Sequence, residues 1–314
     1  MKKTLLLSAV AAMLLYSCRK EHSASPPEPG KKYRVTFNVT NFRSKQSAFA
    51  VRHVARNLAA GDTLTALNSY FDMFHYIVYD DLRNTVRHII QDSTMAGMGT
   101  IVDSLPPGTY RISMVAGKKC LAVRDTFFTH NDYGYGGNSW EDTFFDSFMI
   151  TIGTGGITQD VTLHRTVGKL ELQILDTMPA NADSLVMTVY DDAYSQDLFS
   201  GVFMGGPIVD RFAVRIPAAA KGKPNFAMDR LIGNCSFQFP VTITCKAADN
   251  SVIASVAVQN VNTPPNVKTI LSGDLFSALA GHNSSQTFTT KIDTAWGTTT
   301  HQAGFSLRKR NFGH

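Results

Sequence analysis

The sequence predicts an all-β protein built from two β-sandwich domains in tandem. Apolar and polar residues alternate with a period of two in many short segments, which is the pattern of half-buried strands. Turn motifs rich in Pro, Gly, Asn and Asp separate these segments, and only one segment has apolar residues at helical spacing. The 314 residues, 44% of them hydrophobic, have room for about two domains with cores of their own.

The first predicted domain spans residues 33–166 and begins with its clearest strand. In segment 33–40, Val35, Phe37 and Val39 share one face and polar residues share the other. The motif Leu105-Pro-Pro-Gly-Thr-Tyr predicts a turn before a new strand. Segment 44–60 has apolar residues at helical spacing and predicts a short helix. The further predicted strands of this half are 74–81, 84–90, 110–116, 148–152 and 160–165.

The second predicted domain spans residues 167–296 and has the same kind of alternating strand segments as the first. Residues 297–314 are predicted to form a C-terminal tail. Val-Tyr-Asp-Asp ends segment 185–192 as it ends segment 74–81, which suggests a repeat of one sandwich. With almost no helical pattern, the strand count favours two all-β sandwiches. The predicted strands of this half are 169–176, 185–192, 212–216, 239–246, 252–261, 267–271 and 287–292.

The first 17 residues have the pattern of a secretory signal peptide. Lys2 and Lys3 are followed by an apolar run at 4–16 that is too short to span a bilayer stably. The small residue Ser17 stands directly before Cys18, as in a bacterial lipoprotein signal, whose cysteine becomes the lipidated N-terminus. The sequence therefore predicts a mature chain that begins at Cys18, is held to the outer membrane by lipid and is exposed at the cell surface.

Residues 18–32 are predicted to form a flexible tether between the lipid and the first domain. The segment is polar and carries Pro26, Pro27, Pro29 and Gly30, so it cannot bury enough apolar surface to fold. No later apolar stretch reaches the roughly 18 residues that a membrane helix needs. The lipid is therefore the only membrane contact that the sequence predicts.

The composition argues against nucleic acid as a partner. Removal of the two signal-peptide lysines leaves 28 basic and 25 acidic side chains, a small and scattered excess. The basic cluster Arg308-Lys309-Arg310 is most simply a solvated tail. Beyond Cys18 there are three cysteines, Cys120, Cys235 and Cys245, in a compartment that permits disulfides. Buried unpaired thiols and a Cys235–Cys245 pair across a reversal at Pro240 are both open.

Catalysis finds little support, and no cofactor or metal is expected. The adjacent carboxylates at 80–81 and 191–192 lie at strand ends, where neighbours point to opposite faces and cannot share a substrate. They are interpreted as turn-forming residues. The nine histidines are scattered without metal-ligand spacing, and Gly-x-Ser-x-Gly is absent. The sequence thus predicts a protein that is not an enzyme.

The segment 129–146 is rich in Gly, Asn and aromatic residues. Tyr133, Tyr135 and Trp140 make it a candidate recognition loop for a glycan or a host-surface ligand, because binding residues are often carried by loops on a rigid scaffold. An irregular crossover between sheets explains the same composition. Exposed aromatic rings that stack on sugars would distinguish a glycan-binding lipoprotein from other functions.

Several segments together resemble the FimB/Mfa2 family of Bacteroidetes fimbrial lipoproteins, the anchor and accessory subunits of type V pili. The resemblance rests on the order of several motifs from the lipoprotein signal to Trp296, rather than on one of them. The motifs are Cys18 at the end of its signal, Tyr76-Ile-Val-Tyr-Asp, Leu105-Pro-Pro-Gly-Thr-Tyr, Asp160-Val-Thr-Leu-His-Arg-Thr-Val-Gly-Lys-Leu-Glu-Leu, Lys268-Thr-Ile-Leu-Ser-Gly-Asp-Leu-Phe and Phe288-Thr-Thr-Lys-Ile-Asp.

The resemblance implies two transthyretin-like sandwiches and assembly with other fimbrial subunits by strand addition, in which an extended segment of one subunit completes a sheet of the next. An anchor would keep its lipid, whereas related stalk and tip subunits lose their N-terminal strand to a protease that cuts after a basic residue. Arg43, Arg52 and Arg56 are candidate cleavage positions. Several Asp-Ser/Thr-apolar triplets, such as Asp62-Thr-Leu, also resemble O-glycosylation acceptors of exported Bacteroidetes proteins.

Overall fold

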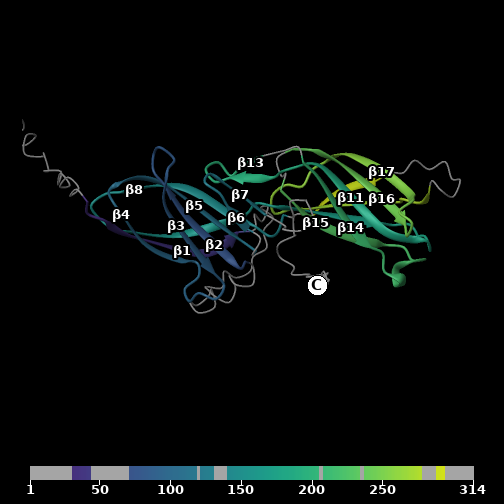
Figure 1. Cartoon of the computed structure of the whole chain (residues 1–314), viewed down its shortest axis with the longest axis horizontal. Coiled ribbons are helices and arrows are strands. Elements are labelled where there is room, and N and C mark those ends of the chain that lie inside the picture. The colour runs from purple at the N-terminus through teal and green to yellow at the C-terminus, as the bar shows by residue number, and fades with distance from the viewer. Residues whose placement is uncertain are drawn as a thin grey trace, which may run out of the picture.

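The computed structural model describes residues 30–43, 71–118, 121–130, 140–204, 208–233, 237–277 and 288–293 (Figure 1). In these ranges the chain forms β-strands and one short 3-10 helix, Ala218–Ala220, and no α-helix. The all-β prediction is therefore confirmed. The same ranges contain no helix that is long and apolar enough to cross a bilayer.

The first sandwich is a seven-stranded sheet that folds over its own core. Its strand order is β3-β2-β5-β8-β9-β1-β4. The β8–β9 ladder joins only Phe144 to Arg165 and Phe145 to His164, so the two parts of the sheet separate beyond this point and can face each other. The strands are β1 (Tyr33–Arg43), β2 (Met73–Tyr79), β3 (Thr85–Asp92), β4 (Thr100–Leu105), β5 (Gly108–Gly117), β8 (Phe144–Ile152) and β9 (Ile157–Arg165).

The predicted first strand lies inside this sheet. β1 pairs parallel with β9 on one side and antiparallel with β4 on the other. Val35, Phe37 and Val39 are buried, as the alternation predicts, and pack in one core cluster with Tyr76 and Val78 of β2. β1 is therefore a structural part of the first core.

The second sandwich has two four-stranded sheets, of order β15-β10-β18-β19 and β14-β11-β16-β17. Side chains from both sheets, such as Leu172 and Ile243, form one buried cluster between them. The strands are β10 (Gly168–Ile174), β11 (Ala182–Asp192), β14 (Ile208–Arg215), β15 (Phe226–Ile232), β16 (Phe239–Ala247), β17 (Val252–Val261), β18 (Lys268–Gly273) and β19 (Phe288–Asp293).

The two sandwiches repeat one topology. The order β3-β2-β5-β8 in the first corresponds to β14-β11-β16-β17 in the second. The parallel pair β1–β9 likewise corresponds to β10–β18. The Val-Tyr-Asp-Asp sequences at 78–81 and 189–192 lie at the ends of the equivalent strands β2 and β11, with Asp80 and Asp81 just beyond β2, so the short sequence repeat has a structural counterpart. The domain boundary at residue 167 stays a prediction.

A small sheet joins the two halves. β7 (Phe127–His130), inserted between β5 and β8, pairs antiparallel with β12 (Ser195–Asp197), inserted between β11 and β14. β6 (Leu121–Val123) and β13 (Phe203–Met204) complete it on either side. A third apolar cluster, which we call the junction cluster, lies beside this sheet and combines Ile77, Tyr79 and Val115 of the first sheet with Leu198, Val167 and Leu231.

Several strands differ from the sequence-based expectation. β4, β6, β7, β12, β13 and β15 were not predicted. The predicted loop 129–146 contains the end of β7 and the start of β8. The predicted helix at 44–60 lies outside the described residues. After β4 the chain crosses at Pro106-Pro107 into β5, and these two strands do not pair with each other.

Candidate functional site

Most of the candidate site residues from the sequence lie outside the described part of the chain. These are Cys18, Arg52, Arg56, Tyr133 and Tyr135. Arg43 is the last residue of β1, where only the backbone is described. Lipidation and proteolytic processing at these positions therefore stay predictions.

Trp140 corrects the recognition-loop prediction. Its side chain is only 2% exposed, and its indole Nε1 donates a hydrogen bond to the carbonyl of Ala193 at 2.8 Å. The ring makes edge contacts with Phe128 and Phe203. Trp140 fills the junction cluster, because a large ring with one donor fits an apolar site that offers one carbonyl. It is not placed to stack on a sugar.

The adjacent carboxylates behave as two different structural groups. Asp80 accepts hydrogen bonds from the backbone N–H groups of Leu82 and Asn84 in the β2–β3 turn, where Arg83 has a φ of 68°. The side-chain hydrogen bond from Asn84, followed by these backbone bonds, lowers the pKa of Asp80. The turn-forming interpretation of Asp80 is thus confirmed.

Asp191 and Asp192 lie at a register shift of β11 and differ in burial. Asp191 is exposed at a φ of 62°, while Asp192 is fully buried. The Oδ1 atom of Asp192 accepts from the backbone N–H groups of Ala193 and Gly233, at 2.8 and 3.1 Å. Asp192 therefore holds two loops together, a role that the turn interpretation did not include.

The described residues offer little for metal or thiol chemistry. They contain no group of three or more His, Cys, Asp or Glu side chains placed to hold a metal ion. Cys245 is a free, fully buried thiol, and burial raises its pKa to about 11. A thiol in this state is a poor nucleophile. Cys120 and Cys235 lie outside the described residues.

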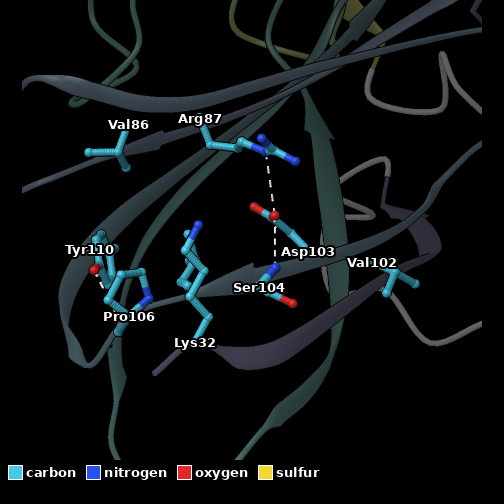
Figure 2. Close-up of a pocket in the computed structure, with 9 residues that line it drawn as sticks. Lys32, Val86, Arg87, Val102, Asp103, Ser104, Pro106 and Tyr110 are labelled. Carbon is cyan, nitrogen blue, oxygen red and sulfur yellow. Dashed lines mark hydrogen bonds and ion pairs between the residues drawn. The ribbon is translucent and has the colours of Figure 1, made fainter. Parts of the chain in front are cut away.

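A groove lies between the two ends of the first sheet. β3 and β4 stand at opposite ends of the strand order, yet they face each other across a cavity of about 480 Å³ (Figure 2). We call it the β3–β4 groove. Figure 2 shows Val86 and Arg87 on one side, with Val102, Asp103 and Ser104 on the other. Lys32, which directly precedes β1, also lines the groove and lies beside Pro106 and Tyr110.

The groove closes at one end through a single side chain. Gln91 of β3 donates from Nε2 to the carbonyl of Thr100, and its Oε1 accepts from the N–H of Gly99. In an ordinary hairpin, backbone hydrogen bonds would join β3 to β4. Here the side-chain amide of Gln91 makes the connection to the backbone of Gly99 and Thr100. β3 and β4 form no ladder with each other, so each keeps an unpaired edge.

The register shows which backbone groups of β4 face the groove. The N–H of Val39 donates to the carbonyl of Gly99, and hydrogen-bonded pairs alternate along an antiparallel ladder. The outward-facing groups of β4 therefore belong to Thr100, Val102 and Ser104. The carbonyl of Thr100 indeed accepts from Gln91, and the N–H of Ser104 donates to the Asp103 carboxylate at 2.8 Å.

One ion pair spans the groove. Arg87 Nε lies 3.4 Å from Oδ1 of Asp103, and the Arg87 side chain is 55% exposed whereas that of Asp103 is 4% exposed. The hydroxyl of Tyr76 is buried nearby, and burial followed by the charge of Asp103 raises the pKa of this tyrosine. Asp103 is thus a buried carboxylate in the lining of the groove. Arg87 and Lys32 are exposed cations of the same lining, and we call the part of the groove beside them its mouth.

Other sheet edges also present apolar side chains to solvent. Exposed β-branched residues lie on edge strands of both sandwiches: Val86 and Ile90 on β3, Val102 on β4, Val209 on β14, Val252 on β17 and Ile292 on β19. Natural proteins usually protect such edges with charges or prolines, because an open edge can pair with another chain. These edges are the surfaces on which the described chain can add a strand.

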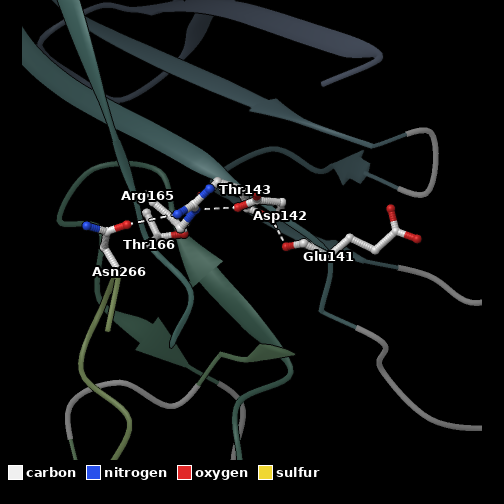
Figure 3. A network of polar contacts seen from close by, with 6 residues as sticks. All are labelled: Glu141, Asp142, Thr143, Arg165, Thr166 and Asn266. Atoms are coloured by element: carbon white, nitrogen blue, oxygen red, sulfur yellow. Dashed lines mark hydrogen bonds and ion pairs between the residues drawn. The ribbon is translucent and has the colours of Figure 1, made fainter. Parts of the chain in front are cut away.

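A polar network fixes the two sandwiches together (Figure 3). Arg165, the last residue of β9, makes a bidentate pair with Asp142, at 2.6 and 2.9 Å. Its Nη1 donates to Oδ1 of Asn266, which precedes β18 in the second sandwich, at 2.9 Å. The guanidinium also lies over the ring of Phe144. Together with the junction cluster and the shared β7–β12 pair, this network makes the connection between the halves well packed.

The fold is similar to those of several solved structures. Mfa2, the fimbrial anchor protein of Porphyromonas gingivalis, matches with a TM-score of 0.54 at 8% identity, over 84% of this chain and 98% of its own. The chain has the fold of a fimbrial anchor protein. A candidate polysaccharide-binding protein from Bacteroides thetaiotaomicron matches with a TM-score of 0.50 at 11% identity, over 77% of this chain and 92% of its own.

A candidate adhesin from Bacteroides ovatus matches equally well, with a TM-score of 0.50 at 11% identity, over 75% of this chain and 88% of its own. No protein-family profile matches the sequence. No curated protein matches it either. The similarity is therefore one of fold, and it extends over nearly the whole length of each of these structures.

Proposed function

We propose that the chain is a fimbrial subunit at the cell surface that is tethered to the outer membrane by lipid on Cys18 and joins a neighbouring subunit by β-strand addition. The fold of the Mfa2 anchor protein supports the fimbrial part of this proposal. The lipoprotein signal ending at Cys18 supports the tether, and a diacylated cysteine with two chains is the kind of lipid that anchors a protein stably.

The open sheet edges are the observation that carries the strand-addition part. Within the described residues, β3, β4, β14, β17 and β19 each have an unpaired side and at least one exposed β-branched residue. An extended segment that pairs with such an edge gains main-chain hydrogen bonds and covers the apolar side chains in one step. Two of these edges lack the usual protection by exposed charges or prolines, since β17 has neither and the one charged residue of β4, Asp103, is buried.

The position of β1 bears on the choice between anchor and stalk. β1 is the strand that directly follows the predicted tether, and its buried side chains belong to the first core. Cleavage after Arg43, Arg52 or Arg56 would separate β1 and the lipid from the rest of the chain. A subunit that keeps both is an anchor, and the packing of β1 in the sheet supports this role.

The deciding experiment is intact-mass analysis of the N-terminus of the chain from native membranes. We expect a lipidated Cys18 and an unbroken chain. A new N-terminus after Arg43, Arg52 or Arg56 would overturn the anchor role and identify a polymerising subunit. In parallel, deletion of the gene is expected to release fimbriae into the medium. Fimbriae that stay assembled and attached to the deleted cells would contradict the fimbrial function as a whole.

A surface glycan-binding lipoprotein is the weaker candidate. One structure with this fold belongs to a candidate polysaccharide-binding protein. However, Trp140, the aromatic residue of the loop that the described structure includes, is buried. Polysaccharide binding that is saturable and lost on substitution of Tyr133 and Tyr135, which the described residues do not include, would favour this alternative.

A further inference from the structure

We propose that the β3–β4 groove is the acceptor for an extended segment of a neighbouring subunit, and that this segment carries an acidic residue facing Arg87 and Lys32. The inference rests on the proposed assembly by strand addition and names the site and the chemistry of the partner. Here two edge strands of the described chain, each paired on one side only, face one another across a cavity.

The first argument is the geometry of the two edges. A strand in the groove would meet the outward-facing N–H and carbonyl groups of Val102 on one side. On the other side, the N–H of Ser93 donates to Asp72, so alternation along the β2–β3 ladder leaves the backbone groups of Ile90 and His88 facing outward. Both edges of the incoming strand would therefore be paired, whereas a strand added to β14 or β17 pairs on one edge.

The second argument is the size and lining of the groove. Its volume of about 480 Å³ lies within the range of ordinary ligand sites. Val86 and Val102 are 47% and 52% exposed on its two sides, so a strand between them covers apolar surface from both. The bridge made by Gln91 sets where the incoming segment must end, because beyond it the strands are tied together.

The third argument is charge. Asp103 is the one carboxylate that lines the groove, and it is buried and already opposite Arg87. The Nε atom of Arg87 pairs with Asp103, and the Arg87 side chain is still 55% exposed. Lys32, in the same lining, is also exposed. The mouth therefore has two cations against one buried carboxylate. An acidic side chain on the incoming segment would balance this excess, while a basic one would be repelled.

The location of the groove fits an anchor. Lys32 is both a lining residue and the last residue of the predicted tether, so the groove lies next to the residue that directly precedes β1. A subunit that inserts its strand there would be joined next to the tether. The load would then pass from the incoming strand through β4 and β3 into the sheet that holds β1.

The test uses the full mature chain and a defined set of peptides. Fluorescent ten-residue peptides with alternating Thr and Val, flanked by prolines to prevent self-pairing, carry one central Glu, Gln or Lys. Anisotropy titration is expected to rank them Glu, Gln, Lys, with about tenfold between the first and the last. The double variant Lys32→Gln/Arg87→Gln is expected to remove the preference for Glu. Equal or tighter binding of the Lys peptide would overturn the charge argument.

A pair of matched proline variants locates the site. Val102→Pro removes an outward-facing N–H of β4, and Val209→Pro does the same on β14, where the bond from Ile216 N–H to Asp183 makes Val209 outward-facing by the same alternation. We expect Val102→Pro to weaken binding of the Glu peptide at least tenfold and Val209→Pro to leave it unchanged. Circular dichroism and thermal melting show that each variant is folded.

The outcomes separate the groove from the proposed function. Loss of binding with Val209→Pro and not with Val102→Pro would overturn the groove as the acceptor, while strand addition at another edge would stand. Absence of binding by every peptide would overturn the acidic acceptor proposed here, whereas the fimbrial function is decided by the release of fimbriae on gene deletion. Should Val102→Pro fail to fold, the charge variants still decide, because they replace exposed side chains.

Discussion

The guanidinium of Arg165 bridges the two sandwiches, because its Nη1 donates to Oδ1 of Asn266 at 2.9 Å while its Nε and Nη2 hold both carboxylate oxygens of Asp142. Only 10% of the Arg165 side chain and 26% of the Asp142 side chain are exposed. In a fimbrial subunit, force applied to one sandwich must pass this junction to reach the other. The network therefore contributes to the stability of the junction, and under the proposed fimbrial function it would also carry force between the sandwiches.

Removal of Arg165 is expected to destabilise the chain strongly. Arg165→Ala leaves Asp142 without its partner, and breaking a largely buried pair costs about 3–5 kcal/mol, so about 2–4 kcal/mol is expected after allowance for the exposure of Asp142. The matched control is Arg215→Ala, because Arg215 pairs with Asp183 at 3.6 Å and is 84% exposed. The control should lose less than about 1 kcal/mol. Urea unfolding measures both, and equal losses would contradict the role of the junction.

Trp140 is expected to act through stability. Trp140→Ala should lower the free energy of unfolding by about 3–5 kcal/mol, because it empties a large site in the junction cluster. Trp140→Phe keeps most of the volume but leaves the carbonyl of Ala193 without its donor, at about 1–3 kcal/mol. Exposed Leu82 provides the control, since Leu82→Ala should change stability by less than about 0.5 kcal/mol. An unchanged melting temperature for Trp140→Ala would refute the buried position.

Acid is expected to weaken the first sandwich through a histidine pair. His75 Nδ1 lies 3.0 Å from His88 Nε2, and burial, followed by the charge of His88, lowers the pKa of His75 from 6.5 to about 4. Between these values the unfolded chain binds a proton that the folded chain does not, so stability falls as the pH drops from 6.5 toward 4. The loss amounts to about 2–3 kcal/mol at pH 4, given 1.36 kcal/mol for each pKa unit.

The measurement is urea unfolding at pH 7 and pH 4.5 for the wild type and for His75→Gln. The variant is expected to show a smaller difference between the two pH values, because it removes the buried histidine whose pKa is lowered to about 4. The exposed residue His164 gives the control, and His164→Gln should keep the wild-type difference. A His75→Gln chain with the full pH dependence would show that other groups cause it.

The sequence predicted the sandwiches well and the junction poorly, for a physical reason. Strands such as β1 and β10 have one buried face, so their alternation is visible without a partner. β2 is buried on both faces, with His75 on the side opposite Tyr76, so its pattern shows little alternation. Of the short strands, β7 and β12 pair across the two halves, while β6 pairs with β7 and β13 with β12. The local sequence of such a short strand does not encode a partner from the other half of the chain.

The candidate site was missed for a related reason. β4 carries Asp103 at an inward-facing position, and a buried carboxylate in a strand breaks the expected apolar pattern. The sequence left both interpretations of Trp140 open, because Gly, Asn and aromatic residues suit an exposed loop as well as the edge of a packed junction. The inward face of β1 was predicted correctly, because Val35, Phe37 and Val39 alternate with polar residues in the sequence and are buried in the structure.

We expect that a separate strand can fill the position of β1 in the sheet, because its inward-facing side chains belong to the first core. β1 lies between β4 and β9, and its Phe37 is fully buried, so a chain that starts after Arg43 should expose an apolar slot and unfold more easily. A synthetic peptide of residues 33–43 is expected to restore the melting temperature when added in excess, since a ligand of the folded state stabilises it by mass action. The same peptide with Phe37→Lys should not restore it, because a lysine cannot enter the core of the first sandwich. Full stability of the shortened chain without any peptide would show that β1 is dispensable, and the loss of β1 by cleavage would then open no slot for a neighbouring subunit.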